Sequence, residues 1–129
     1  MSCPFCQLEL NEQQKVVLQN DHCLFLQMPH EILVGSGIII PRAHRETVFD
    51  LTAVEWAATH ALLAQVKTLL DAQYAPQGYN LGWNSGRVAG QEVFHAHLHI
   101  IPRYADEPLA GKGIRYWLKQ PTNRRPRQN

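Results

Sequence analysis

The chain has few cysteines, no long apolar run and almost no net charge. Its longest apolar runs, such as residues 38–40, are far shorter than the roughly 18 residues that cross a bilayer. We therefore expect no membrane partner. Three cysteines, with no signal-peptide pattern after Met1, favour a reducing, cytoplasmic location. Twelve Lys and Arg residues against eleven Asp and Glu argue against a dedicated nucleic-acid-binding protein.

What remains is the composition of an ordinary folded domain. Hydrophobic residues make up 45% and charged residues 18% of the 129 positions, which is enough for one core. No acidic residue follows Glu107, whereas six Lys and Arg residues do. We therefore predict a single domain over residues 1–110 and a basic, partly disordered C-terminal extension over residues 111–129.

The order of short apolar runs and turns predicts several strands. Residues 15–19 and 22–27 are separated by Asn20 and Asp21, which is typical of a hairpin. Residues 38–40 form a β-branched run closed by Pro41. Residues 79–83 and 93–101 have the pattern of two further strands, the last closed by Pro102.

One long helix lies between these strands. Thr52 and Glu55 have the spacing of a capping box, and Pro76 ends the helix near residue 75. An apolar stripe at Ala58, Leu62, Val66 and Leu69 would face the core. The predicted class is α+β, with a mostly antiparallel sheet and one long helix.

The N-terminal cysteine pair has the spacing Cys3-x-x-Cys6. In a reducing compartment this spacing indicates half of a metal site, a redox pair or a coincidence. A redox pair is expected after a strand, and no strand pattern precedes Cys3, so we favour a metal. Cys23 lies in an apolar run and is expected in the core.

Three histidines recur at every second position, at His95, His97 and His99. On a strand, alternate side chains share one face, so the three rings would form a ridge while Phe94, Ala96, Leu98 and Ile100 face the core. The ridge permits two chemistries. One is a metal held by three imidazoles, as in a metallohydrolase. The other is nucleophilic attack by neutral His97 on phosphorus, with its second ring nitrogen held by a backbone carbonyl.

Residues 94–103, with the sequence Phe-His-Ala-His-Leu-His-Ile-Ile-Pro-Arg, resemble the signature of the histidine triad (HIT) nucleotide-binding proteins. The segment from Ile40 to His44 resembles the Pro-Lys-x-His segment of that family, and residues 84–91 resemble its phosphate-binding loop. The start of the chain, Cys-Pro-Phe-Cys, resembles its zinc-bearing bacterial branch. The likeness covers roughly residues 3–105.

The resemblance implies a nucleotide hydrolase or nucleotidyl transferase acting at the α-phosphate of a nucleoside phosphoramidate or a dinucleoside polyphosphate. His97 would form a nucleotidyl-histidine intermediate, His99 would bind the phosphate, and Asn84 would contact the phosphate or leaving group. Backbone N–H groups from Gln91 to Val93 would receive the oxyanion. The resemblance also implies a homodimer and a structural zinc held by Cys3, Cys6, His44 and His95.

Two positions depart from the family pattern. The segment from Leu26 to His30 lacks the acidic residue that usually binds ribose, so Gln27 is our candidate for that contact. Glu92 stands where Ser or Thr is usual beside the phosphate. A catalytically weak nucleotide-binding adaptor therefore remains an alternative, beside the three-histidine metallohydrolase.

Overall fold

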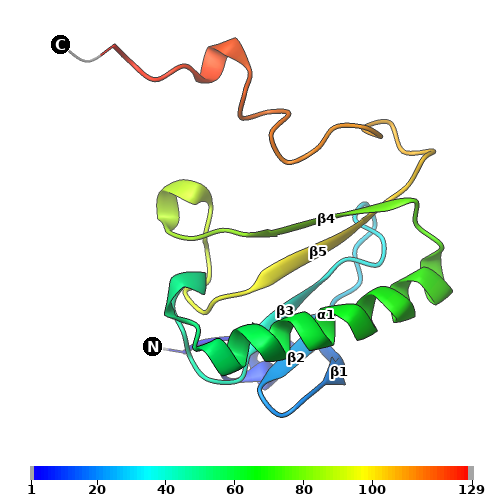
Figure 1. Cartoon of the computed structure of the whole chain (residues 1–129), viewed down its shortest axis with the longest axis vertical. Coiled ribbons are helices and arrows are strands. Elements are labelled where there is room, and N and C mark those ends of the chain that lie inside the picture. The colour runs from blue at the N-terminus through cyan, green and yellow to red at the C-terminus, as the bar shows by residue number, and fades with distance from the viewer. Residues whose placement is uncertain (1, 128–129) are drawn as a thin grey trace.

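Five antiparallel strands and one long helix make up the domain, as the sequence predicted. The computed structural model describes residues 2–127. Strands β1 (Lys15–Gln19), β2 (Cys23–Gln27), β3 (Gly37–Pro41), β4 (Gly78–Trp83) and β5 (Leu98–Arg103) pair in the order β1-β2-β3-β5-β4. Helix α1 (Ala53–Tyr74) lies along one face of this sheet (Figure 1). Short 3-10 helices occupy Leu8–Leu10, Val48–Asp50, Arg87–Ala89 and Pro121–Asn123.

Local sequence signals determine the helix ends. The Thr52 hydroxyl accepts a hydrogen bond from the Glu55 N–H, and the Glu55 carboxylate accepts one from the Thr52 N–H, so the predicted capping box is formed. At the other end Ala75 takes a left-handed conformation immediately before Pro76. Within the part of the chain that the structure describes, no helix is long and apolar enough to cross a membrane.

The main core lies between α1 and the sheet. Phe25, Ile39 and Ile100 from three neighbouring strands pack against Leu62 and Val66 of the helix. The predicted stripe on α1 is confirmed at Leu62 and Val66, and half-buried Ala58 packs against the same core. At the C-terminal end it is wrong, because Leu70 is buried and Leu69 is only half-buried. The helix is therefore turned slightly from the orientation that the apolar residues alone indicate.

The other face of the sheet is covered by the N-terminal segment. Phe5 and Leu8 pack there against Leu24, Leu26 and Ile40. Strand register places His99 of β5 on this same face, because His99 pairs with Ile38 and Ile38 pairs with Leu26. The triad histidine therefore lies on the opposite side of the sheet from α1.

Strand β5 differs from its predicted range, residues 93–101. It begins only at Leu98, because the residues before it form a loop held by side-chain hydrogen bonds. It also continues through Pro102 to Arg103. Proline is tolerated there because β3 pairs with β5 only as far as Ile100, so no strand on that side needs the missing N–H.

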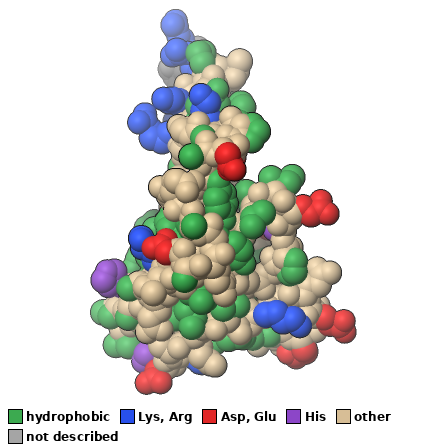
Figure 2. Space-filling view, turned by 90° about the vertical axis from the view of Figure 1, so that its right-hand side faces the viewer, with side chains coloured by type: hydrophobic (Ala, Val, Ile, Leu, Met, Phe, Trp, Pro, Cys, Tyr) green, Lys and Arg blue, Asp and Glu red, His purple; other side chains and the backbone are tan. Residues whose placement is uncertain are grey.

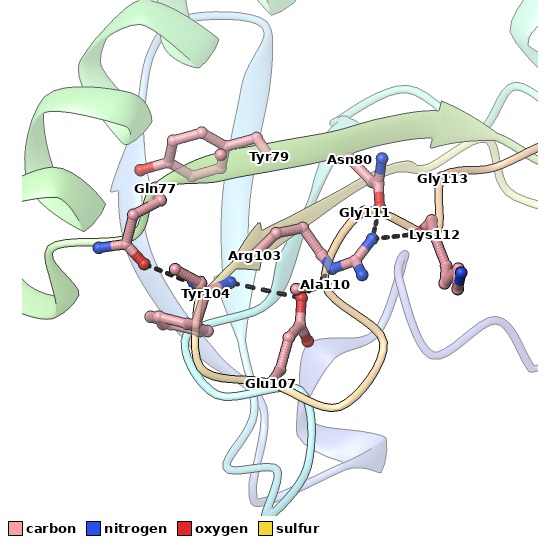
Figure 3. Close-up of a pocket in the computed structure, with 12 residues that line it drawn as sticks. Gln77, Tyr79, Asn80, Arg103, Tyr104, Glu107, Ala110, Gly111, Lys112 and Gly113 are labelled. Atoms are coloured by element: carbon pink, nitrogen blue, oxygen red, sulfur yellow. Dashed lines mark hydrogen bonds and ion pairs between the residues drawn. The ribbon is translucent and has the colours of Figure 1, made fainter.

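The chain after β5 is fastened to the domain by Arg103. Its guanidinium donates hydrogen bonds to the Glu107 carboxylate, to the Asn80 side chain of β4 and to the Lys112 carbonyl (Figure 3). It also donates one to the Leu109 carbonyl. Beyond this point the extension projects away from the sheet (Figure 1), and basic side chains gather near its far end (Figure 2). The last two residues of the predicted tail, 128 and 129, lie outside the described residues.

Candidate functional site

His97 lies in the loop just before β5, at the edge of a cavity. Its side chain is held by the backbone, since Nδ1 is 2.8 Å from the carbonyl oxygen of His95. A carbonyl oxygen can only accept, so Nδ1 carries the hydrogen and donates it. The other ring nitrogen, Nε2, then keeps its lone pair. This is the tautomer that a nucleophilic imidazole requires.

The cavity has a volume of about 440 Å³ and lies on the sheet face opposite α1. Apolar side chains from three strands form its floor, among them Leu26 of β2, Ile38 of β3 and Ile101 of β5. Polar groups at its rim include His97, His99 and Glu92. A cavity of this size with an apolar floor and a few polar groups is suited to a small molecule such as a nucleotide.

His99 is the second histidine in the cavity wall. Its ring centroid is 4.8 Å from that of His97, and the two rings meet edge to face. Burial lowers the pKa of His99, and the nearby His97 lowers it further, so the neutral form is favoured at pH 7. Its Nε2 atom is buried without a hydrogen-bonding partner within residues 2–127. A buried nitrogen without a protein partner is unusual, and His99 is among the residues that line the cavity.

His95 is fully buried and its ring points to the N-terminal cysteines rather than along a ridge. Its Nε2 lies 2.8 Å from the Pro41 carbonyl oxygen, which fixes the hydrogen there and leaves the Nδ1 lone pair free. Burial lowers the pKa of His95, with His44 and His97 acting in the same direction. The ring is therefore a neutral imidazole, the form that binds a metal.

The free Nδ1 of His95 faces three other potential metal ligands. Cys3, Cys6, His44 and His95 offer atoms that all lie within 4.8 Å of one another. The Cys3 and Cys6 sulfurs are each 3.5 Å from His95 Nδ1, and the Cys6 sulfur is 3.2 Å from His44 Nδ1.

These distances fit a tetrahedral zinc ion. Bond lengths of about 2.3 Å to sulfur and about 2.0 Å to nitrogen give a sulfur–nitrogen edge of about 3.5 Å. Two thiols and two imidazoles form a closed ligand set that leaves no position for a substrate. Such a set is typical of a structural site rather than a catalytic one.

The predicted three-histidine ridge is not formed. Only His99 stands on a strand, while His95 turns to the cysteines and His97 is bonded to its backbone. In the described part of the chain, the metal-competent group includes His95 but neither His97 nor His99. The alternative of a metal held by the three triad histidines therefore has no support in the geometry.

The loop from residue 84 to residue 93 carries the other candidate residues. Gln91 is buried, and both ends of its side chain are used within the protein, with Oε1 accepting from Gly86 and Nε2 donating to the carbonyls of Glu46 and Val93. Its backbone N–H donates to the Gly86 carbonyl. Gln91 thus braces the loop, and its N–H is not free for an oxyanion as we had expected.

The remaining candidates differ in whether they line the cavity. Glu92 and Val93 line the cavity, and within residues 2–127 their backbone N–H groups have no hydrogen-bonding partner. Asn84 is exposed and lies against Gly90, outside the cavity wall. Gln27 lines the cavity, but its side-chain amide also donates to the Gly35 carbonyl at 3.0 Å.

Two contacts of the triad segment were missed from the sequence. The ring centroid of Phe5 lies 5.1 Å from that of His97. In the sequence, the only signal for Phe5 is its position between Cys3 and Cys6. Arg45 accepts a backbone hydrogen bond from Ala96, and its guanidinium is paired with Glu55 at the start of α1. No local pattern indicates a contact that depends on residues so far apart in the chain.

Comparison with known proteins agrees with this geometry. The profile of the HIT domain matches residues 9–106. The HIT-like protein MG132 of Mycoplasma genitalium is 31% identical over 125 residues, covering 96% of this chain and 85% of the relative. Adenosine 5'-monophosphoramidase hnt1 of Schizosaccharomyces pombe is 30% identical over 115 residues, covering 88% of this chain and 83% of the relative.

Solved structures show the same fold. A HIT family protein from Bacillus anthracis is 31% identical and superposes with a TM-score of 0.73, over 81% of this chain and 75% of that one. A zinc-bound histidine triad family protein from Mycobacterium smegmatis is 25% identical with a TM-score of 0.73, over 86% of this chain and 81% of that one.

Proposed function

Because this chain belongs to the HIT domain family, we propose that it is a nucleotide hydrolase or nucleotidyl transferase acting at the α-phosphate of its substrate. The observation that carries the proposal is the Nδ1–H of His97 held by the His95 carbonyl, which leaves Nε2 free beside the cavity. The substrate class is a nucleoside phosphoramidate or a dinucleoside polyphosphate.

In the first step the lone pair of His97 Nε2 attacks the α-phosphorus, and the bond from phosphorus to the leaving group breaks. The positive charge that develops on the imidazole is stabilised by the His95 carbonyl. His99 also lines the cavity, and we propose that its Nε2, which has no other partner within residues 2–127, contacts a phosphate oxygen once the substrate is bound. The free N–H groups of Glu92 and Val93 would supply further donors. Asn84 lies outside the cavity wall, so we give it no contact with the leaving group. Water then cleaves the phosphorus–nitrogen bond and restores His97.

The names of several relatives support this substrate class. Besides the phosphoramidase of Schizosaccharomyces pombe, they include adenylylsulfatase HINT3 of Arabidopsis thaliana and a bis(5'-nucleosyl)-tetraphosphatase. All three names describe cleavage at a phosphate of a nucleotide. The ribose contact in this chain falls to Gln27, which lines the cavity in place of the acidic residue usual in the family.

We assign Cys3, Cys6, His44 and His95 as ligands of a structural zinc ion. The ion would hold the N-terminal segment to the triad loop and would leave His97 and His99 free for the substrate. We also propose a reducing, cytoplasmic location, which would keep Cys3 and Cys6 available as metal ligands.

We also propose a homodimer formed through β4. This strand is last in the sheet order, so its outer edge is unpaired within the described residues. Exposed Leu81 and Trp56 lie at this side, and the Trp56 ring meets that of Trp83 at 5.8 Å. A long unpaired edge with apolar neighbours is commonly covered by a second copy.

A nucleotide-binding adaptor with weak catalysis is the second candidate. It is favoured by one observation, the Glu92 side chain at the cavity wall near His97. A carboxylate at that position would repel the phosphate unless it points away.

A turnover panel separates the two candidates. Adenosine and guanosine phosphoramidates and dinucleoside polyphosphates are offered to the full chain, and samples quenched in alkaline denaturant are searched by mass spectrometry for a nucleotidyl adduct on His97. We expect turnover of at least one substrate and an acid-labile adduct. Tight nucleotide binding without turnover or adduct on any substrate would favour the adaptor.

A further inference from the structure

The turn that carries two metal ligands also carries a wall of the nucleotide cavity. Phe5 lies between Cys3 and Cys6, and both Pro4 and Phe5 line the cavity with His97. The Phe5 ring centroid is 5.1 Å from that of His97 and 5.9 Å from that of His95, edge to face in both cases. One side chain thus contacts the nucleophile and a metal ligand together.

The turn is tight, so Phe5 cannot move independently of the cysteines. The Cys6 N–H lies 3.4 Å from the Cys3 sulfur and 3.2 Å from the Cys3 carbonyl oxygen, and the Gln7 N–H donates to that carbonyl at 2.9 Å. A metal that fixes both sulfurs would therefore fix the backbone of Pro4 and Phe5.

Without a metal, fewer contacts hold this segment. Gln14 donates to the Pro4 carbonyl at 3.0 Å, and the Phe5 ring packs against Leu24, Leu26 and Ile40. Phe5 itself is only half-buried, and Cys6 is exposed.

We propose that Phe5 is a positioning residue that couples metal binding to nucleotide binding. The metal-ordered turn holds the Phe5 ring against His97 and completes the cavity wall, so metal and nucleotide each strengthen the binding of the other. This inference rests on the proposed function. Coupling between two binding sites is reciprocal. A bound nucleotide must therefore raise the affinity for the metal by the same factor by which the metal raises the affinity for the nucleotide.

A second route between the sites must be distinguished. His95 is a metal ligand through its side chain and holds His97 through its backbone carbonyl. Replacing Phe5 by leucine removes the ring but keeps an apolar side chain against Leu24 and Leu26. Phe49→Leu is the matched control, because Phe49 is exposed and does not line the cavity.

The experiment measures zinc transfer from the zinc-loaded full chain to a chromogenic chelator, with and without adenosine monophosphate. We expect saturating nucleotide to slow zinc loss about fivefold or more in the wild type and in Phe49→Leu. In Phe5→Leu the two rates should differ by less than about twofold. Equal slowing in Phe5→Leu and in the wild type would assign the coupling to His95. If the wild type binds the nucleotide but loses zinc at the same rate, the two sites are not coupled.

A second readout does not depend on a nucleotide. Histidine ring resonances are assigned by NMR in the zinc-loaded and chelator-stripped wild type and in Phe5→Leu. We expect stripping to shift the His97 ring signal in the wild type, and to shift it by less than half as much in Phe5→Leu. If adenosine and guanosine monophosphates fail to bind, the proposed function fails, and this readout alone decides the role of Phe5. A His97 ring signal whose chemical shift is the same with and without zinc in the wild type would overturn the inference.

Discussion

The His97 Nδ1 atom lies 2.8 Å from the carbonyl oxygen of His95. Two properties of the site follow from this hydrogen bond. It fixes the tautomer of His97, so the lone pair is on Nε2 of a residue that lines the cavity. It also joins the proposed nucleophile to a proposed metal ligand, because the His95 side chain turns to Cys3 and Cys6 while its backbone holds His97. The period-two spacing of the triad is therefore compatible with two different sites.

The first prediction tests this hydrogen bond by chemical rescue. His97→Gly should lower turnover by about 10³-fold or more, because the nucleophile is lost. Added imidazole should restore part of the activity, since it can attack phosphorus while donating its N–H to the His95 carbonyl. We expect 1-methylimidazole, which has no N–H, to rescue about five- to tenfold less well. The measurement is steady-state turnover against rescuer concentration.

Equal rescue by the two imidazoles would show that the His95 carbonyl has no part in catalysis. His60→Gly is not a suitable control because glycine would weaken α1. His60→Ala is suitable, since His60 is exposed on the helix, and it should leave turnover unchanged.

The second prediction separates function from stability at His99. Its buried Nε2 has no partner within residues 2–127, which costs folding free energy. His99→Leu removes that polar atom and fits the apolar cavity floor, so we expect an unchanged or higher melting temperature. Turnover should fall about 100-fold, as when one transition-state donor is removed. A variant that melts lower and keeps full turnover would mean that His99 is a packing residue.

The sequence predicts those parts of the fold that depend on neighbouring residues. The Thr52–Glu55 capping box, the hairpin around Asn20 and Asp21, and the helix end before Pro76 all appear in the structure. Each depends on hydrogen bonds or backbone preferences within a few positions. The grouping of Cys3 and Cys6 with His44 and His95 came from family resemblance, since the sequence spacing alone left three interpretations open.

The sequence does not predict features that depend on tertiary contacts. Strand periodicity placed His95 beside His97 on one ridge, but the hydrogen bond to the Pro41 carbonyl and the two cysteines turn its ring away. The brace formed by Gln91 depends on the Glu46 carbonyl, 45 positions earlier. Likewise, the four contacts of Arg103 could not be assigned before the path of the C-terminal extension was known.

The third prediction concerns the metal site. We expect about one zinc ion per chain by metal analysis. His44→Ala should lose it and unfold more easily, by about 3 kcal/mol or about 10 °C in melting temperature, because the ion closes the N-terminal segment onto the triad loop. Below the melting range, turnover of His44→Ala should fall less than about tenfold, since a closed structural site supplies no catalytic group.

The matched control for this variant is His60→Ala. Both histidines are exposed, but only His44 belongs to the metal group. A preparation that is fully folded and active without any metal would contradict the assignment, as would equal destabilisation by the two substitutions.

The fourth prediction concerns acid stability and the buried ion pair that links the triad loop to α1. Burial opposes ionisation of Glu55, but hydrogen bonds from Arg45 and from the Thr52 backbone outweigh it, so the pKa of Glu55 lies below its ordinary value of 4.5. A lowered folded-state pKa means that the unfolded chain binds the proton more readily. The stabilisation is therefore complete above about pH 4.5 and is lost as the pH falls through the folded-state pKa.

Glu55→Gln should consequently lower the free energy of unfolding by about 1–2 kcal/mol at pH 7, because it removes the charge but can keep the cap. The difference from the wild type should shrink steadily as the pH falls from about 4.5 through the lower folded-state pKa of Glu55, where the wild-type carboxylate itself becomes protonated. Urea titrations at several pH values measure it. Glu12→Gln, at an exposed position, is the control and should show no such dependence.

The same ion pair should also hold the triad loop, because the Arg45 carbonyl accepts the Ala96 N–H. Loss of the pair in Glu55→Gln should therefore increase the rate of hydrogen exchange at the Ala96 amide. An unchanged exchange rate there would mean that the pair stabilises α1 without holding the triad loop.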